Sequence, residues 1–251
     1  MKTLLQICLL LIAAGLHAQT HTEKISKTFT FEKKSADNAL MIANINGSIK
    51  VEGYTGDKIL VEVTKSVYAK TEARLEKGKQ EIQLGVIDRA DSIILYSEGG
   101  CSNFGKRTDK RGKNKRDWGY NWNNNCRNCN EEYDYRLDFV VKVPASIHID
   151  VSTINNGDVS VQGVNGVVLA NNINGSIKLT NLVREAEAST INGDVDVEYT
   201  LNPKKDCRFY SLNGDINALF QKGLGANLSF ESFNGNFYTN IDKLETLPVQ
   251  V

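Results

Sequence analysis

The chain has 251 residues, of which 41% are hydrophobic and 24% are charged. This composition is typical of a globular protein and excludes a disordered or collagen-like chain. The 30 basic and 30 acidic side chains cancel, so the net charge gives no reason to expect a nucleic-acid partner. Only three histidines are present, which leaves little material for a histidine base or a multi-histidine metal site.

The first 18 residues are typical of a secretory signal peptide. Lys2 precedes an apolar run over residues 4–16, and Ala18 offers a cleavage position. The run is shorter than the roughly 20 residues that a membrane span needs, although a buried N-terminal helix is the alternative. We therefore expect a mature chain that begins near Gln19, has no integral membrane segment, and is located in the periplasm, at the cell surface or outside the cell.

Four cysteines follow the predicted signal peptide, namely Cys101, Cys126, Cys129 and Cys207. An even number of cysteines in an oxidising compartment favours structural disulfides. The preferred bridge joins Cys101 to Cys126 or Cys129. The spacing of Cys126 and Cys129 also occurs in zinc and redox sites, but no histidine and no βαβ pattern lies nearby.

A short unit recurs along the chain: an apolar residue, Asn, Gly, then Ser, Asp or Asn, then another apolar residue. Its glycines are Gly47, Gly157, Gly175, Gly193, Gly214 and Gly235. From the second copy onward they are spaced by 18, 18, 21 and 21 residues. Asn-Gly is a strong turn signal, because Gly takes a positive φ without steric cost. We interpret these six glycines as structural turn residues.

The residues after each turn alternate between apolar and polar, which indicates β-strands with one buried face. Two arrangements fit: a sandwich of antiparallel hairpins, or a parallel β-solenoid of about six coils. The regular step favours the all-β solenoid. It predicts an asparagine ladder and an interior lined by the apolar residues on both sides of each turn: Ile154, Ile173, Ile191, Leu212 and Phe233, with Val159, Ile177, Val195, Ile216 and Phe237.

The segment before the main repeats resembles the opening of the same architecture. Alternation predicts strands over residues 28–31, 60–67, 93–96 and 135–143. Residues 72–84 fit either a short helix or an irregular strand. We therefore expect a single domain over residues 19–251.

Residues 99–133 form an insertion of different composition. Its basic run over residues 106–116 contains Lys106, Arg107, Lys110, Arg111, Lys113, Lys115 and Arg116, and its central aromatic residues are Trp118, Tyr120 and Trp122. Aromatic residues outside a core can form a binding platform, and adjacent basic residues suit an anionic polysaccharide. The alternative is a solvated, disulfide-closed loop whose aromatic residues pack back onto the solenoid.

No constellation of residues supports catalysis clearly. Asp194 and Asp215 would lie on adjacent coils, as paired carboxylates do in a retaining glycosidase or a calcium site. Asp, Asn and Ser also bind their own backbone in turns, and this explains their recurrence better. We assign no catalytic, cofactor-binding or metal-binding residue, and we expect no cofactor.

The repeat units, with the strand that ends at Pro144 and the run over residues 149–155, resemble the exported bacterial "putative adhesin" β-solenoid family of unknown function, in the style of its Bacteroidetes members. The resemblance covers about residues 40–240 apart from the insertion. It implies a right-handed parallel β-helix-like fold and no enzyme activity, and it supplies no binding residues.

These observations predict a non-enzymatic cell-envelope protein that presents a solenoid face, or the basic and aromatic loop, to a glycan or protein. The alternatives are a periplasmic scaffold or envelope-stress module, and a β-helix polysaccharide lyase or hydrolase acting through Asp194 or Asp215. The sequence does not specify an oligomeric state.

Overall fold

The structure, a computed structural model, describes residues 19–100, 102–106, 118–122 and 132–241. The chain divides into two compact units, Met1–Gln221 and Lys222–Val251. Every described helix and strand belongs to the first unit, whereas residues 222–241 of the second form neither. No helix among the described residues has the length and hydropathy required to cross a membrane.

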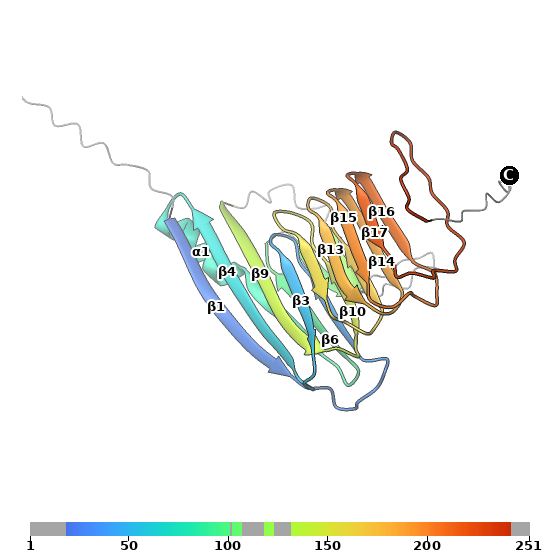
Figure 1. Ribbon diagram of the computed structural model, residues 1–251. Helices are drawn as coiled ribbons and strands as arrows, with labels where there is room; N and C mark the ends of the chain where they lie inside the picture. The colour runs from blue at the N-terminus through green and yellow to red at the C-terminus, as the bar shows by residue number, and fades with distance from the viewer. Residues whose placement is uncertain (1–18, 101, 107–117, 123–131, 242–251) are drawn as a thin grey trace, which may run out of the picture. The chain divides into compact units, whose positions relative to one another are not determined.

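Two β-sheets of the first unit face each other, and their inward side chains share one hydrophobic core (Figure 1). The larger sheet contains, in order of pairing, β1 (Gln19–Phe29), β4 (Ile59–Ala69), β9 (Tyr133–Pro144), β3 (Ile49–Tyr54), β11 (Val159–Gln162), β13 (Ile177–Leu182), β15 (Val195–Tyr199) and β17 (Ile216–Leu219). The smaller sheet contains β16 (Arg208–Asn213), β14 (Ala186–Asn192), β12 (Val168–Asn171), β10 (His148–Ser152), β2 (Ala39–Ala43), β6 (Ser92–Glu98) and β5 (Gln83–Asp88). A separate hairpin joins β7 (Ser102–Lys106) to β8 (Trp118–Trp122).

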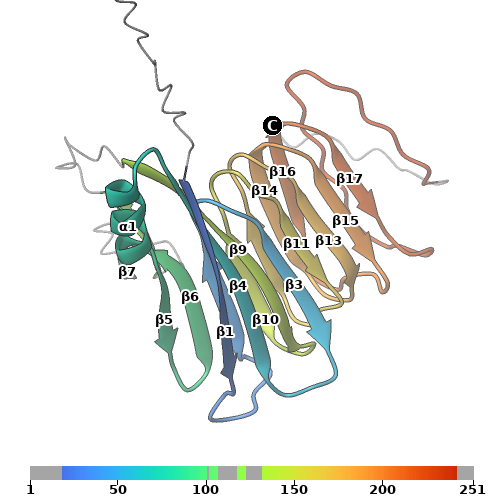
Figure 2. The same ribbon diagram turned by 90° about the vertical axis from the view of Figure 1, so that its left-hand side faces the viewer.

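The helix α1 (Glu72–Glu81) packs against β1, β4 and β9 (Figure 2). Its N-terminus is capped by Thr71, whose side chain accepts a hydrogen bond from the backbone N–H of Arg74. Near its C-terminus, the buried Lys65 of β4 donates to the carbonyl of Lys79 at 2.8 Å and pairs with Glu23 at 2.8 Å. A cation near the carbonyl end of a helix is favourable, so Lys65, which lies on β4, links α1 to the edge strand β1.

The local predictions agree with these elements. The strand expected over residues 135–143 is β9, in which buried and outward-facing residues alternate along the whole length. Strands also occur at the other three predicted segments, and residues 72–81 take the helical alternative. Alternation with period 2 is a local signal, and it requires no knowledge of which strands pair.

The predicted right-handed parallel β-helix solenoid of about six coils is wrong. The structure is a β-sandwich of two mixed sheets, in which β4 pairs antiparallel with both β1 and β9, and β5 pairs antiparallel with β6. The regular spacing of the repeat units indicates only that neighbouring units pair in parallel, as β11 does with β13 and β13 with β15. It carries no information on how the long strands β4 and β9 join the sheet.

The repeated glycines are required by the neighbouring backbone. A Cβ at Gly157 would lie 2.2 Å from the carbonyl carbon of Gly47, and one at Gly175 would lie 2.3 Å from the Gly157 carbonyl oxygen. The same holds at Gly193 and Gly214, with 2.3 Å and 2.1 Å to the carbonyl oxygen of the preceding glycine. A positive φ was the expected reason, but Gly157, Gly175 and Gly214 do not have one. Gly235 lies in the second unit.

The predicted interior is correct for the residues that follow three of the turns and wrong for the residues that precede the later turns. Val159, Ile177 and Val195, which follow the turns, are fully buried. Ile173 and Ile191, which precede them, are 37% and 39% exposed on the outside of the sandwich. Leu212 and Ile216 are exposed as well. Phe233 and Phe237, which flank the turn at Gly235, belong to the second unit.

Candidate functional site

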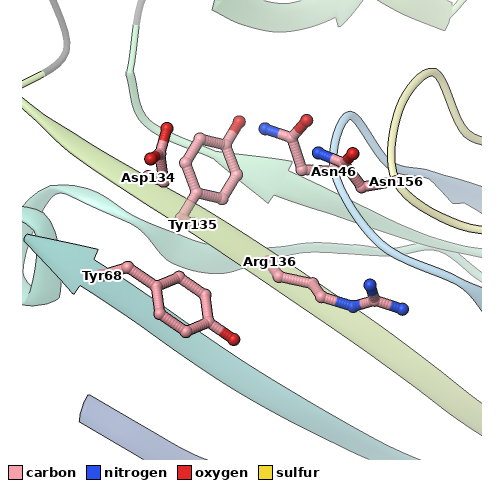
Figure 3. A pocket seen from close by; sticks show the side chains of 6 residues that line it. All are labelled: Asn46, Tyr68, Asp134, Tyr135, Arg136 and Asn156. Atoms are coloured by element: carbon pink, nitrogen blue, oxygen red, sulfur yellow. The ribbon is translucent and has the colours of Figure 1, made fainter. Parts of the chain in front are cut away.

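An open hollow of about 510 Å³ lies on the larger sheet, where β4 and β9 pair (Figure 3). Its lining residues are Asn46, Tyr68, Asp134, Tyr135, Arg136 and Asn156. Two of them come from turns, one from β4 and three from β9. The hollow therefore combines residues that are far apart in the sequence.

Strand pairing places the polar side chains of the hollow on one face. Tyr68 of β4 is directly opposite Asp134 of β9, and Ser66 is opposite Arg136. Because side chains alternate along a strand, all four point away from the core. Tyr68 is 39% exposed, whereas Tyr135 points inward and is buried. An exposed aromatic ring thus adjoins a carboxylate and a guanidinium.

Two asparagine amides complete the rim. Asn46 precedes the turn glycine after β2, and Asn156 has a left-handed backbone with φ 59°. Figure 3 shows Asn46 and Asn156 next to each other, with Arg136 on the neighbouring β9. Asparagine tolerates this backbone conformation better than most residues, so the turn itself brings an amide to the hollow.

Asp138 holds the guanidinium of Arg136 in place. One carboxylate oxygen of Asp138 accepts from Arg136 Nε at 2.6 Å, and the other accepts from the backbone N–H and the hydroxyl of Ser48 at 2.8 Å and 2.5 Å. Burial raises the pKa of Asp138, but the hydrogen bonds from Arg136 and Ser48 outweigh it, and the pKa lies below its ordinary value. The two terminal nitrogens of Arg136 make no hydrogen bond within the described part of the chain.

We expect the Asp138 contacts to stabilise the fold only while the carboxylate is charged. Because the pKa of Asp138 is lowered on folding, the contribution is complete above the unfolded pKa of about 3.9 and is lost as the pH falls through the folded value. Asp138→Asn should therefore lower the free energy of unfolding at pH 7. Urea unfolding at several pH values measures the deficit, which should shrink below about pH 4. A deficit independent of pH would contradict this role.

The asparagine ladder predicted from the repeats is confirmed, and it begins beside the hollow. The amide nitrogen of Asn174 donates to the side-chain oxygen of Asn155 at 2.8 Å, Asn192 donates to Asn174 at 2.8 Å, and Asn213 donates to Asn192 at 2.9 Å. Every donor points back toward the start of the series. The ladder therefore fixes the turns that follow the one carrying Asn156.

The polar residues after each turn glycine also connect neighbouring units. Asp158 accepts from the backbone N–H of Ser176, and Asp194 accepts from that of Asp215. We expected each side chain to bind its own turn, whereas the acceptors cross to the next unit. Among the described residues, no group of three or more His, Cys, Asp or Glu is placed to hold a metal ion.

The aromatic residue at the centre of the insertion is buried against the smaller sheet, in a cluster separate from the main core. Tyr120 is 8% exposed, and its hydroxyl contacts the Ala43 carbonyl at 2.8 Å and the Ser97 hydroxyl at 2.7 Å. The β7–β8 hairpin thus covers part of the smaller sheet, as the packed alternative for the insertion predicts. Lys106, Trp118 and Trp122 lie on this hairpin.

The other predicted residues of the loop fall outside the described residues. They are Arg107, Lys110, Arg111, Lys113, Lys115 and Arg116, together with Cys101, Cys126 and Cys129. Cys207 is a free thiol, 3.2 Å from the hydroxyl of Tyr199. A disulfide through Cys207 is therefore not supported.

No sequence motif marks Tyr68, Asp134, Arg136 or Asn156 as site residues. The only sequence signal of Tyr68, Asp134 and Arg136 is the outward phase of two alternating strands, which many solvent-facing residues share, and that of Asn156 is its place in a repeat turn. The antiparallel pairing of β4 with β9 creates the hollow, and this pairing is a long-range property of the fold.

No protein-family model and no curated protein matches this chain. Several solved structures are weakly similar. A "putative cell adhesion protein" from Clostridium sporogenes is 8% identical, with a TM-score of 0.34 over 79% of this chain and 99% of that one. A "putative adhesin" from Parabacteroides merdae is 9% identical, with a TM-score of 0.22 over 80% and 97%. A "putative lipid binding protein" from Parabacteroides distasonis is 11% identical, with a TM-score of 0.22 over 80% and 97%.

Structures described as adhesins are thus among those similar to this chain. The identities and TM-scores assign neither a family nor a function to it. A function for this chain therefore has to be inferred from the residues of the hollow.

Proposed function

We propose that this chain is a non-enzymatic, exported cell-envelope protein that binds an uncharged glycan in the hollow beside Tyr68. Export is inferred from the signal-peptide pattern of the first 18 residues. The observation that carries the proposal is the meeting of an exposed tyrosine ring with a carboxylate, a guanidinium and two amides.

The ring of Tyr68 suits the apolar face of a sugar. It is 39% exposed on a strand whose backbone is paired on both sides, with β1 and with β9. A ring held on a rigid strand loses little conformational entropy on binding, and tyrosine offers both an apolar surface and a hydroxyl. Binding sites typically combine such a surface with a few fixed polar groups.

The polar groups can both accept hydrogen bonds from sugar hydroxyls and donate to them. Asp134 accepts hydrogen bonds, Arg136 donates them, and the amides of Asn46 and Asn156 do both. Arg136 is a single cation beside two carboxylates, Asp138, with which it is paired, and Asp134, so the three groups together carry a charge of −1 that disfavours an anionic ligand. The hollow therefore favours a neutral sugar, in contrast to the anionic polysaccharide predicted for the basic loop. That earlier prediction stays a prediction, because the loop lies largely outside the described residues.

A glycan array probed with residues 19–251 tests the proposal. The array should hold neutral and acidic oligosaccharides, and titration calorimetry should follow on the best ligand. Tyr68→Ala is expected to weaken binding by about tenfold, equivalent to about 1.4 kcal/mol. Most of the loss should come from the stacking surface.

Leu60→Ala provides a matched control, because Leu60 lies on the same outer face of β4 and is 37% exposed. It pairs with Lys142, outside the lining of the hollow. The affinity of the Leu60→Ala variant for the glycan should equal that of the unmodified chain. Absence of binding to every neutral glycan, or equal losses in the two variants, would reject the proposed site.

A further inference from the structure

A row of apolar residues follows the outside of the sandwich at the turns. We call it the outer apolar row; it consists of Ile45, Ile154, Ile173, Ile191 and Leu212. Backbone hydrogen bonds make its members neighbours, since the carbonyls of Ile45, Ile154 and Ile173 accept from Asn155, Asn174 and Asn192 in turn. The row therefore crosses the strands as one continuous line of side chains.

One end of the outer apolar row is covered by the chain's own aromatic residues. Ile45 is 7% exposed and forms a cluster with Ala43 and Tyr120, against which Phe104 and Ile154 also pack. The rings of Phe104 and Tyr120 meet edge-on, with centroids 5.3 Å apart. Here the occupant of the row is known: it is a two-stranded hairpin that presents aromatic side chains.

The rest of the row is open. The exposed fraction rises from 7% at Ile45 to 37% at Ile173, 39% at Ile191 and 60% at Leu212. Large apolar side chains exposed side by side mark interaction surfaces more often than isolated ones do. The open residues have the same position in the repeat as Ile45, so the open part continues an interface that already exists.

The borders of the open part carry no charge. On one side lies the asparagine ladder, including Asn174 and Asn192, and on the other lie the outward residues Asn171 and Ser189. A hydrophobic centre with a polar, uncharged rim is the usual anatomy of a protein interface. Such a rim neither attracts nor requires a charged ligand.

We propose that the open part of the outer apolar row, from Ile173 to Leu212, is a docking surface for a strand of a partner protein that presents aromatic side chains. The partner repeats at Ile173 and Ile191 the contact that Tyr120 and Phe104 make at Ile45. This surface is on the smaller sheet and is independent of the hollow on the larger one. The small apolar area implies a weak and reversible contact.

Methyl NMR on residues 19–251, with labelled isoleucine, tests this surface directly. The probe is a capped synthetic peptide with the sequence of Trp118–Trp122, which is the strand that carries Tyr120. We expect saturable shifts of the Ile173 and Ile191 methyl signals and no shift of Ile45, which the hairpin already covers. The double variant Ile173→Thr with Ile191→Thr lacks both reporter methyl groups, so binding to it is followed through the Leu212 methyl signals with labelled leucine. The Leu212 shift seen with the unmodified chain should be lost in this variant while its circular dichroism stays unchanged.

The same peptide with serine in place of its three aromatic residues is the matched control. Equal shifts with this control, no shifts at millimolar peptide, or a response retained by the double variant would overturn the proposal. Shifts that depend on protein concentration without any peptide would assign the surface to a second copy of the chain instead, and would overturn it as well.

Discussion

Gly47→Ala is expected to destabilise the protein by about 4 kcal/mol or more, a large part of the stability of an ordinary domain. Gly47 has a φ of 122°, and a Cβ there would lie 2.2 Å from the carbonyl oxygen of Leu137. That oxygen belongs to β9, so the clash can be relieved only by moving a central strand of the larger sheet. Urea unfolding followed by circular dichroism measures the change.

Gly105→Ala is the matched control, because a Cβ at Gly105 meets nothing within 4 Å. Its free energy of unfolding should stay within about 0.5 kcal/mol of that of the unmodified protein. If Gly47→Ala were as mild as Gly105→Ala, the close packing of the first turn against β9 would be refuted.

Tyr120→Phe is expected to lower the free energy of unfolding by about 2–4 kcal/mol, because it removes a hydroxyl that forms hydrogen bonds with several buried groups. The hydroxyl of Tyr120 accepts from the backbone N–H of Ser97 at 3.0 Å, shares a hydrogen bond with the Ser97 side chain, and lies 2.8 Å from the Ala43 carbonyl. Burial raises the pKa of Tyr120 well above its ordinary value, so the group stays protonated at every physiological pH. Thermal and urea unfolding both report the loss.

Tyr210→Phe is the corresponding control, since Tyr210 is 47% exposed and its hydroxyl makes no hydrogen bond among the described residues. A change above about 0.5 kcal/mol there, or none at Tyr120, would contradict the anchoring role. The result also bears on any deletion of the insertion. Because Tyr120 covers Ala43 and Ile45, removal of residues 101–129 would expose part of the smaller sheet, and a loss of binding would not locate a binding site.

The hollow and the outer apolar row differ in how far the sequence could reveal them. The apolar residue before each Asn-Gly is visible in the repeat, but its alternation does not say which of the two flanking apolar positions is buried. Val159 turned out to be inside and Ile173 outside. In the hollow only Asn46 and Asn156 belong to repeat units, whereas Tyr68 and Arg136 meet only through the antiparallel pairing of β4 with β9.

The amino-acid order alone was sufficient for the strands after the first five turns, for the asparagine ladder and for the five turn glycines that lie against neighbouring backbone. All three depend on signals within a few residues or on a constant spacing. Tertiary structure decided the rest. The joining of long antiparallel strands to the parallel repeat units made a sandwich of two mixed sheets.

The same contrast applies to individual residues. A tyrosine in an insertion can belong to a binding surface or be buried. Tyr120 is buried because the hairpin packs on the smaller sheet, where the Tyr120 hydroxyl donates to the carbonyls of Ala43 and Ser97. The turn glycines show it most clearly. Their regular spacing marks where no side chain is tolerated, but the reason at Gly157, Gly175 and Gly214 is the carbonyl group of the preceding glycine, which comes within reach only when the strands pair.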